Sequence, residues 1–119
     1  MNERKFKAKL RKHLLPHCHI QSMSSLANAG TPDLWLSGAR DLWIEVKYNE
    51  SAPRIVKPRL TALQRDWLNK RYAEGRPVMV VCGISPSEGV IFTESEWDVG
   101  RIDRRSFDEL ITIILDHVT

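Results

Sequence analysis

The feature that most constrains the fold is the run of residues 42–48, in which apolar and polar side chains alternate. Its apolar members, at positions 42, 44 and 46, point to one face of an extended chain, whereas Trp43, Glu45 and Lys47 point to the other. A second apolar run at residues 34–36 precedes it across a turn-forming stretch. Together the two runs predict an antiparallel hairpin with one face in the core.

Helical periodicity precedes the hairpin. Residues 3–15 predict an amphipathic helix that Pro16 ends. Its apolar stripe comprises Phe6, Leu10, Leu14 and Leu15. Residues 17–30 are mixed in character and predict a short strand or an irregular connection, and residues 49–58 predict a polar loop after the hairpin.

Two capping-box spacings mark the starts of later helices. Thr61 and Gln64 open a helix that Gly75 ends, and Ser106 and Glu109 open the last helix. The expected buried side chains are Leu63, Trp67 and Leu68 in the first and Phe107, Leu110, Ile111, Ile114, Leu115 and Val118 in the second.

Apolar runs at residues 78–84 and 89–93 predict two further strands. The element order predicts one small α/β domain over residues 1–119, with a mixed central sheet flanked by helices. The composition, 42% hydrophobic and 28% charged, is typical of soluble globular proteins, and no apolar run approaches the roughly 18 residues of a membrane span. Because two cysteines, Cys18 and Cys82, cannot form a disulfide framework, we expect free thiols. A cytoplasmic protein of a prokaryotic or phage-infected cell, not a secreted one, is the expectation.

Charge is distributed unevenly along the chain. Residues 1–76 hold fifteen basic and seven acidic side chains, whereas residues 77–119 hold three basic and eight acidic ones. Clustered Lys and Arg displace condensed counterions from phosphates, so this pattern favours a nucleic-acid partner. A solvated charged surface is the alternative.

Three ionisable side chains converge at the predicted hairpin. Glu45 and Lys47 share one face of their strand, and antiparallel pairing brings Asp33 level with Glu45. Two neighbouring carboxylates repel each other, and a hard divalent cation such as Mg²⁺ relieves that repulsion. Such a set is typical of phosphodiester hydrolysis, although a turn residue beside a surface ion pair would produce the same spacing.

This arrangement resembles a known signature. Gly30-Thr31-Pro32-Asp33, followed after eleven residues by Glu45-Val46-Lys47, is similar to the PD-(D/E)XK nuclease motif. More narrowly it resembles the VRR-NUC and Holliday-junction-resolvase-like branch, because Glu3 opens the first helix and Thr61-Ala62-Leu63-Gln64 opens the next, with Thr where Ser is usual. The resemblance covers residues 3 to about 84 and implies a restriction-endonuclease-like fold; the acidic tail matches no motif.

The resemblance also implies residue roles. Asp33, Glu45 and the backbone carbonyl of Val46 would hold Mg²⁺ or Mn²⁺, and Lys47 would position or activate the attacking water. Glu3 would orient a metal-bound water or complete a second metal site. Gln64 would contact Lys47, the metal shell or the phosphate, while capping of its own helix is an equally open role. DNA contacts are predicted for Arg54, Lys57 and Arg59 in the loop and for Lys5, Lys9 and Lys12 on the first helix.

The implied activity is that of a metal-dependent endodeoxyribonuclease acting in replication, recombination or repair. We expect selectivity for branched DNA such as a Holliday junction, and a homodimer whose contact is the last helix, because Ile113 extends its apolar surface beyond one stripe. The alternatives are a restriction-like or nicking nuclease on duplex or flap DNA, and a non-catalytic nucleic-acid-binding module of the same fold.

Two other groups of side chains are weaker candidates. Trp35 and Trp43 lie near the predicted site, where they would stack on bases or pack beneath a helix. His13, His17, Cys18 and His19 have metal-binding chemistry, but Pro16 interrupts their helical spacing, so zinc is not expected. Cys82 lies in an apolar run and is expected in the core.

Overall fold

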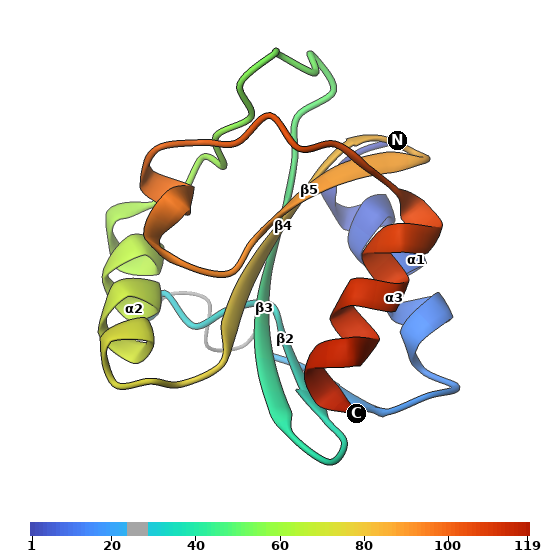
Figure 1. Cartoon of the computed structure of the whole chain (residues 1–119), viewed down its shortest axis with the longest axis vertical. Coiled ribbons are helices and arrows are strands. Elements are labelled where there is room, and N and C mark those ends of the chain that lie inside the picture. The colour runs from blue at the N-terminus through green and yellow to red at the C-terminus, as the bar shows by residue number, and fades with distance from the viewer. Residues whose placement is uncertain (24–28) are drawn as a thin grey trace.

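The computed structural model describes residues 1–23 and 29–119, and it places six strands in one sheet between two layers of helices (Figure 1). The strands are β1 (His19–Ser22), β2 (Leu34–Ser37), β3 (Asp41–Tyr48), β4 (Val78–Ser85), β5 (Glu88–Phe92) and β6 (Arg105–Ser106). The helices are α1 (Glu3–Leu14), α2 (Ala62–Ala73) and α3 (Phe107–Val118), with a short 3₁₀ helix, η2 (Ser95–Asp98). Residues 24–28, part of the segment predicted as a short strand or connection, lie outside the described residues.

The strands lie in the sheet in the order in which the chain reaches them. β3 and β4 are parallel, and each other neighbouring pair is antiparallel, which makes the sheet mixed. The predicted α/β fold class is therefore confirmed, and so is the hairpin of β2 and β3.

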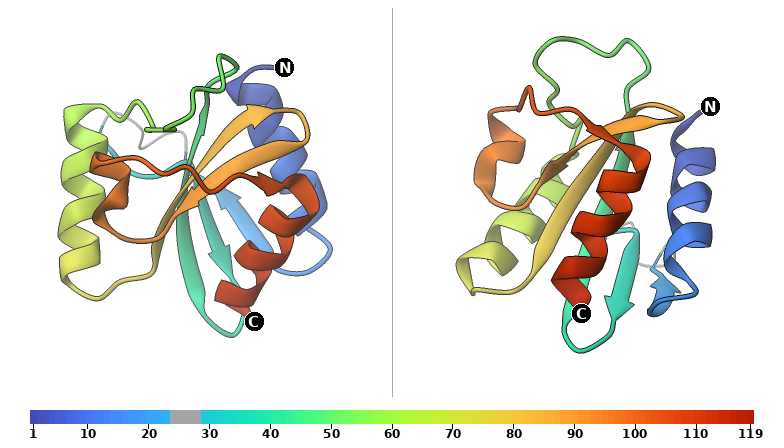
Figure 2. Two further views of the ribbon diagram at one scale, coloured as in Figure 1. Left: turned by 45° about the horizontal axis from the view of Figure 1, so that its top comes forward. Right: turned by 45° about the vertical axis from the view of Figure 1, so that its right-hand side comes forward.

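Figure 2 shows α1 and α3 on one face of the sheet and α2 with η2 on the other. The predicted stripe of α1 is buried at Phe6, Leu10 and Leu14. Phe6 lies directly on β4, because a side chain at Gly83 would stand 2.8 Å from the Phe6 ring. This close approach fixes the first turn of α1 above the centre of the sheet. Leu15, predicted to extend the stripe, is instead 49% exposed, because it follows the last helical residue.

α2 has the predicted caps but not the whole predicted stripe. Thr61 and Gln64 form both hydrogen bonds of the capping box, and Gly75, with a φ of +79°, follows the C-cap. Leu68 is fully buried and Trp67 is half-buried, but Leu63 is 56% exposed, so the prediction for Leu63 was wrong. The start of α2 packs through its backbone rather than through this side chain.

The segment after β5 folds over the α2 face, although its sequence gave no motif. Trp97 in η2 is fully buried, and its Nε1 donates a hydrogen bond to Asn69 Oδ1 at 2.9 Å. A bridge between Val56 and Arg101 joins the loop after β3 to this segment. On α3, Ile113 is half-buried and packs against the core. None of the described helices is long and apolar enough to cross a membrane.

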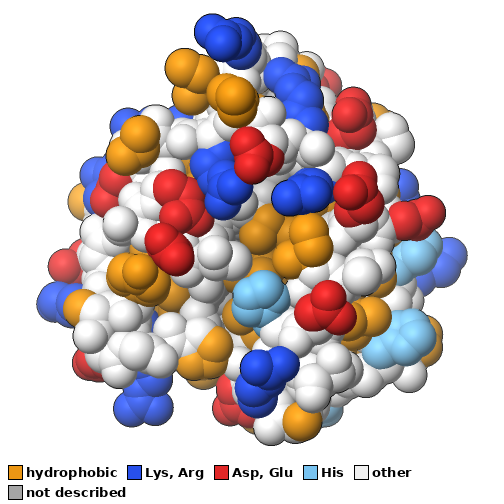
Figure 3. All heavy atoms as spheres, in the orientation of Figure 1, with side chains coloured by type: hydrophobic (Ala, Val, Ile, Leu, Met, Phe, Trp, Pro, Cys, Tyr) orange, Lys and Arg blue, Asp and Glu red, His pale blue; other side chains and the backbone are white. Residues whose placement is uncertain are grey.

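Several acidic residues of the C-terminal half have local structural roles. Asp98 forms an ion pair with Arg65 at 2.8 Å, and Glu96 accepts a hydrogen bond from the backbone N–H of Thr93. Glu109 completes the capping box of α3, whose hydrogen bonds lower the pKa of its carboxyl. Figure 3, drawn in the orientation of Figure 1, shows positive and negative side chains intermixed on this face of the molecule. These acidic residues of the C-terminal half therefore pair with nearby groups or cap a helix.

Candidate active site

The β2–β3 hairpin places Asp33 beside the middle of β3. Leu34 pairs with Ile44 in the antiparallel register, so Asp33 comes level with Glu45. The Asp33 side chain then accepts a hydrogen bond at Oδ2 from the backbone N–H of Val46, 2.9 Å away. Asp33 and Glu45 thus lie side by side as the sequence predicted, and a main-chain N–H orients the carboxylate of Asp33.

Glu45 is the only charged residue among the buried side chains of the described structure, with 2% of its surface exposed. Its Oε2 accepts a hydrogen bond from Gln64 Nε2 at 3.2 Å and lies 3.5 Å from Lys47 Nζ. The Lys47 side chain is itself 14% exposed. Glu45 and Lys47 lie two residues apart on β3, so the strand directs both to the face covered by α2.

Burial raises the pKa of Glu45 to about 8 from an ordinary 4.5. The nearby charge of Asp33, a side-chain hydrogen bond with it and the charge of Glu3 contribute to this increase in pKa, while Lys47 opposes it. The raised pKa shows that the positive charge near Glu45 does not fully offset the cost of burying its ionised carboxylate.

This pKa gives a prediction for stability in the absence of metal. Between pH 4.5 and about 8 the folded chain binds a proton at Glu45 that the unfolded chain releases, so the free energy of unfolding falls as pH rises through this window. Glu45→Gln has no proton to release and keeps the hydrogen bond with Gln64. With chelator at pH 9, we expect its melting temperature to exceed that of the wild type by about 5 °C or more.

The difference should vanish below pH 4.5, where the carboxyl is protonated in both the folded and the unfolded chain. Glu50→Gln, at an exposed position after β3, is the matched control and should follow the wild-type curve. Melting curves of Glu45→Gln and wild type that stay parallel from pH 4 to pH 9 would contradict the prediction.

Gln64 caps its own helix, one of the two roles that the sequence left open, and it also contacts Glu45. Its Oε1 accepts the backbone N–H of Thr61 at 2.9 Å, and its Nε2 donates to Glu45. Gly30 lies against the start of this helix: its φ is +82°, and a side chain there would collide with the carbonyl oxygen of Leu63. The glycine of the G-x-P-D turn thus lets α2 approach closely enough for Gln64 to reach β3.

α1 adds two charged residues to the site. Glu3 is exposed, yet its charge raises the pKa of both Glu45 and Cys82. It lines a hollow of about 380 Å³ beside Tyr48 and Arg59. Burial raises the pKa of Cys82 to about 11, which keeps this core thiol neutral.

Lys7, for which the sequence predicted no role, forms an ion pair with Asp33. Its Nζ lies 3.3 Å from Oδ1, and both side chains are partly exposed. Lys7 follows Glu3 by four residues, so both project from neighbouring turns on one side of α1. That spacing was the available signal, but the side of α1 that faces Asp33 depends on tertiary packing.

The predicted DNA contacts differ in availability. Arg54, Lys57 and Arg59 are exposed, and none of them forms an ion pair with any residue that the structure describes. Lys5 and Lys12 are also exposed. Lys9, in contrast, donates to the carbonyl of Pro86 at 2.6 Å and lies 4.1 Å from the centre of the Phe107 ring. It is engaged within the fold, so it is the weakest of the six as a DNA contact.

The tryptophans near the site pack against one another. Trp35 and Trp43 have ring centres 6.2 Å apart, and Trp43 and Trp67 are separated by 5.5 Å. All three are half-buried, and Trp43 and Trp67 pack against the core on the α2 face, which matches the packing alternative. The Nε1 of Trp35 is buried and has no hydrogen-bond partner within the described residues.

The oxygen atoms at the site suit a hard divalent cation. Glu45 is a buried carboxylate with too little compensating charge, and Asp33 is beside it. The N–H and C=O of one strand residue point to the same neighbouring strand, so the N–H of Val46 that binds Asp33 implies that its carbonyl is on that side too. Over residues 1–23 and 29–119, no group of three His, Cys, Asp or Glu side chains is arranged to hold a metal. Two carboxylates and a carbonyl are the set that remains.

Comparisons with known proteins agree with this fold. The chain matches no family model and no curated protein. A solved structure described as a "VRR_NUC domain protein" superposes on 99% of this chain and on 88% of its own chain, with a TM-score of 0.55 and 18% sequence identity. At that identity the similarity concerns the fold, and it is the fold to which the sequence motif pointed.

Proposed function

We propose that this protein is a metal-dependent endodeoxyribonuclease of the PD-(D/E)XK superfamily. The observation that carries the proposal is the buried Glu45, flanked by Asp33 and Lys47 and contacted by Gln64. A non-catalytic module of this fold would gain nothing from burying a carboxylate at such a cost. The fold shared with a VRR_NUC domain protein supports the same conclusion.

Asp33, Glu45 and the carbonyl of Val46 would hold Mg²⁺ or Mn²⁺. When bound, the cation supplies Lewis-acid stabilisation of a phosphoryl oxygen and lowers the pKa of water. Metal binding would require Lys7 to release the Asp33 carboxylate, because the two residues form an ion pair in the metal-free protein. Metal binding also requires Glu45 to be ionised, so a proton leaves its carboxyl on binding.

Lys47 supplies a fixed positive charge next to these carboxylates. Its ammonium would hold the attacking water by hydrogen bonding and stabilise the negative charge that develops on the phosphate oxygens. Attack of that water on phosphorus would form a new P–O bond and break the bond to the leaving oxygen. The water would release one proton to solvent and the leaving oxygen would take one up, so the protons balance. Gln64 keeps the Glu45 carboxylate in place during this step, because its own position is fixed by the cap of α2.

Metal dependence is the first test of the proposed function. With plasmid or branched DNA, we expect cleavage in Mg²⁺ or Mn²⁺ and none in excess chelator. Ca²⁺ should bind without supporting cleavage, because it takes longer and looser coordination and activates water less well. Robust cutting in chelator would refute a metal-dependent mechanism, and binding without cutting in every metal would favour the non-catalytic module.

We also propose that the working unit is a homodimer that prefers branched DNA. Each chain has one candidate site, whereas a four-way junction requires two incisions related by near two-fold symmetry. α3 retains less free apolar surface than the sequence indicated, since Ile113 packs against the core. Three other apolar side chains, Ile55, Val99 and Ile102, are exposed by 56%, 76% and 56%. Their two loops are joined by the Val56–Arg101 bridge, so we assign the contact to this apolar cluster.

Sedimentation at micromolar concentration tests this assignment. We expect a dimer for the wild type and a monomer for Val99→Asp with Ile102→Asp, because charges there oppose apolar contact. Leu63→Asp, at an equally exposed apolar position on α2, is the control and should stay dimeric. A monomeric wild type that cuts junctions and duplexes equally would remove the branched-DNA proposal and leave the nuclease proposal standing.

A further inference from the structure

A groove runs along α1 on the side that faces the first strands of the sheet. It has a volume of about 420 Å³, and no acidic side chain lines it among the described residues. Its basic lining residues are Arg4, Lys7, Arg11 and Lys12. Its apolar lining residues are Ala8, Leu15 and Leu34. The groove thus combines an apolar floor with cationic walls.

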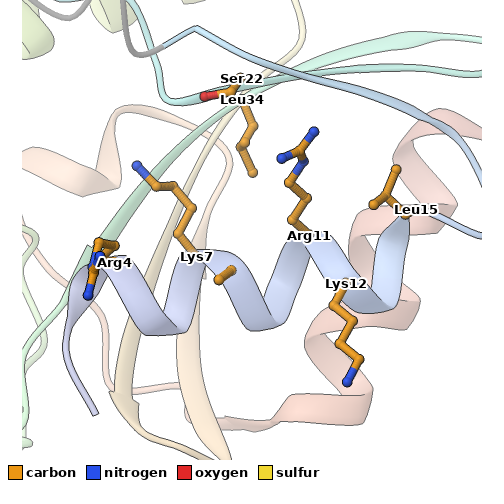
Figure 4. Close-up of a pocket in the computed structure, with 8 residues that line it drawn as sticks. Arg4, Lys7, Arg11, Lys12, Leu15, Ser22 and Leu34 are labelled. Atoms are coloured by element: carbon orange, nitrogen blue, oxygen red, sulfur yellow. The ribbon is translucent and has the colours of Figure 1, made fainter.

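Three of the four cations that line this groove have no ion-pair partner among the described residues. Positions 4, 7 and 11 are spaced by three and four residues, which aligns them along one side of the helix. Figure 4 shows Lys7 and Arg11 extending from α1 toward the strand that carries Leu34, whereas Lys12 points away from it. No described carboxylate lies within ion-pair distance of Arg4, Arg11 or Lys12, and only Lys7 is paired.

Lys7 connects the groove to the candidate active site, because its ammonium lies 3.3 Å from Asp33. If the scissile phosphate of a DNA strand lies at Asp33 and Glu45, the nucleotide next to that phosphate would lie in the groove. Lys7 and Arg11 are one helical turn apart, about 6 Å along the axis, so they can contact successive parts of an extended strand. The groove is thus placed to hold DNA next to the cleavage point.

We propose that this groove binds an unpaired nucleotide of the substrate strand, adjacent to the scissile phosphate. The proposal rests on the proposed nuclease function and specifies the form of DNA that the site takes. A volume of about 420 Å³ lies within the range of small-molecule sites, roughly 300–1,000 Å³, so it suits a nucleotide rather than the width of a duplex. Leu15, 49% exposed, and the exposed Ala8 give apolar contact to a base, which a paired base inside a duplex could not use.

Binding measured by fluorescence anisotropy in chelator tests the groove without any cleavage. The probes are a short labelled oligothymidylate, the same chain with abasic central positions, and a hairpin duplex with the same number of phosphates. Arg4→Gln with Arg11→Gln removes two groove cations. We expect this pair to weaken oligothymidylate binding about tenfold and to lower the salt slope by about 1.4, or 0.7 per lost contact with a single strand.

The matched control removes two exposed cations elsewhere, Lys70→Gln on α2 with Arg105→Gln before α3, and should change binding less than twofold. Leu15→Ser keeps the charge and should weaken oligothymidylate binding about threefold while leaving the abasic probe unchanged. Equal losses in the groove pair and the control pair would overturn the proposal, because only net charge would then matter.

Equal affinity for the base-bearing and abasic probes would also overturn it, as would a duplex whose binding depends on Leu15 in the same way. The proposed function fails separately: wild-type protein that binds through the groove yet cuts no DNA in Mg²⁺ or Mn²⁺ would refute the nuclease while supporting the groove.

Discussion

Asp33→Asn and Glu45→Gln are each expected to reduce DNA cleavage in Mg²⁺ by at least about a thousandfold. Loss of an outer partner of a metal ligand already costs about 10–100-fold, and these two side chains are proposed as the ligands themselves. Both amides preserve the shape of the carboxylate, so the hydrogen bonds from Val46 and Gln64 retain an acceptor. The loss then reports on charge and metal rather than on packing.

DNA binding by the same variants should be unchanged or tighter. Phosphate contacts come from Lys and Arg side chains, and each variant removes a negative charge that repels the phosphate. Asp41→Asn removes an exposed carboxylate from the first residue of β3 and is the matched control, with wild-type cleavage expected. Near wild-type cutting by either site variant would show that the reaction occurs elsewhere.

Glu45→Gln combines two opposite expectations. It should abolish cleavage, yet stabilise the metal-free protein above pH 8, because burial of the ionised carboxylate is costly to the fold. A residue that serves only stability would not show this combination. The two measurements together therefore distinguish a functional carboxylate from a structural one.

The parts of the site that sequence predicted were those determined by local pattern. Alternation along β3 assigned Glu45 and Lys47 to one face, and the short turn of the hairpin fixed the register that brings Asp33 level with them. The capping box at Thr61 likewise follows from residues three apart. Each of these features needs only a few neighbouring residues to form.

The parts that sequence did not predict depend on how elements dock. Leu63 matched an apolar stripe, but the helix turns this side chain to solvent because its start packs against Gly30. Lys7 reaches Asp33 only because Phe6 fixes α1 against Gly83. Trp97 fills the α2 face from a segment with no regular periodicity. Each of these features depends on residues that are far apart in the sequence.

Lys47→Met is expected to lower the cleavage rate by about 10²–10³-fold at saturating Mg²⁺, the usual cost of removing one preorganised donor that stabilises charge in a transition state. Methionine keeps most of the length and apolar volume of the lysine stem, so the half-buried side chain should still pack on β3 beside Cys82. Because the ammonium lowers the pKa of Glu45, its removal should also weaken metal binding, which raises the Mg²⁺ concentration needed for half-maximal activity.

These two effects can be separated by titrating Mg²⁺. A variant that recovers the wild-type rate at high Mg²⁺ would show that Lys47 acts only by favouring the ionised Glu45. A rate that stays low at saturation is the expected result, and it would show that the ammonium acts on the reacting water or phosphate. Lys70→Met, on the exposed surface of α2, controls for the general loss of a lysine and should cut at the wild-type rate.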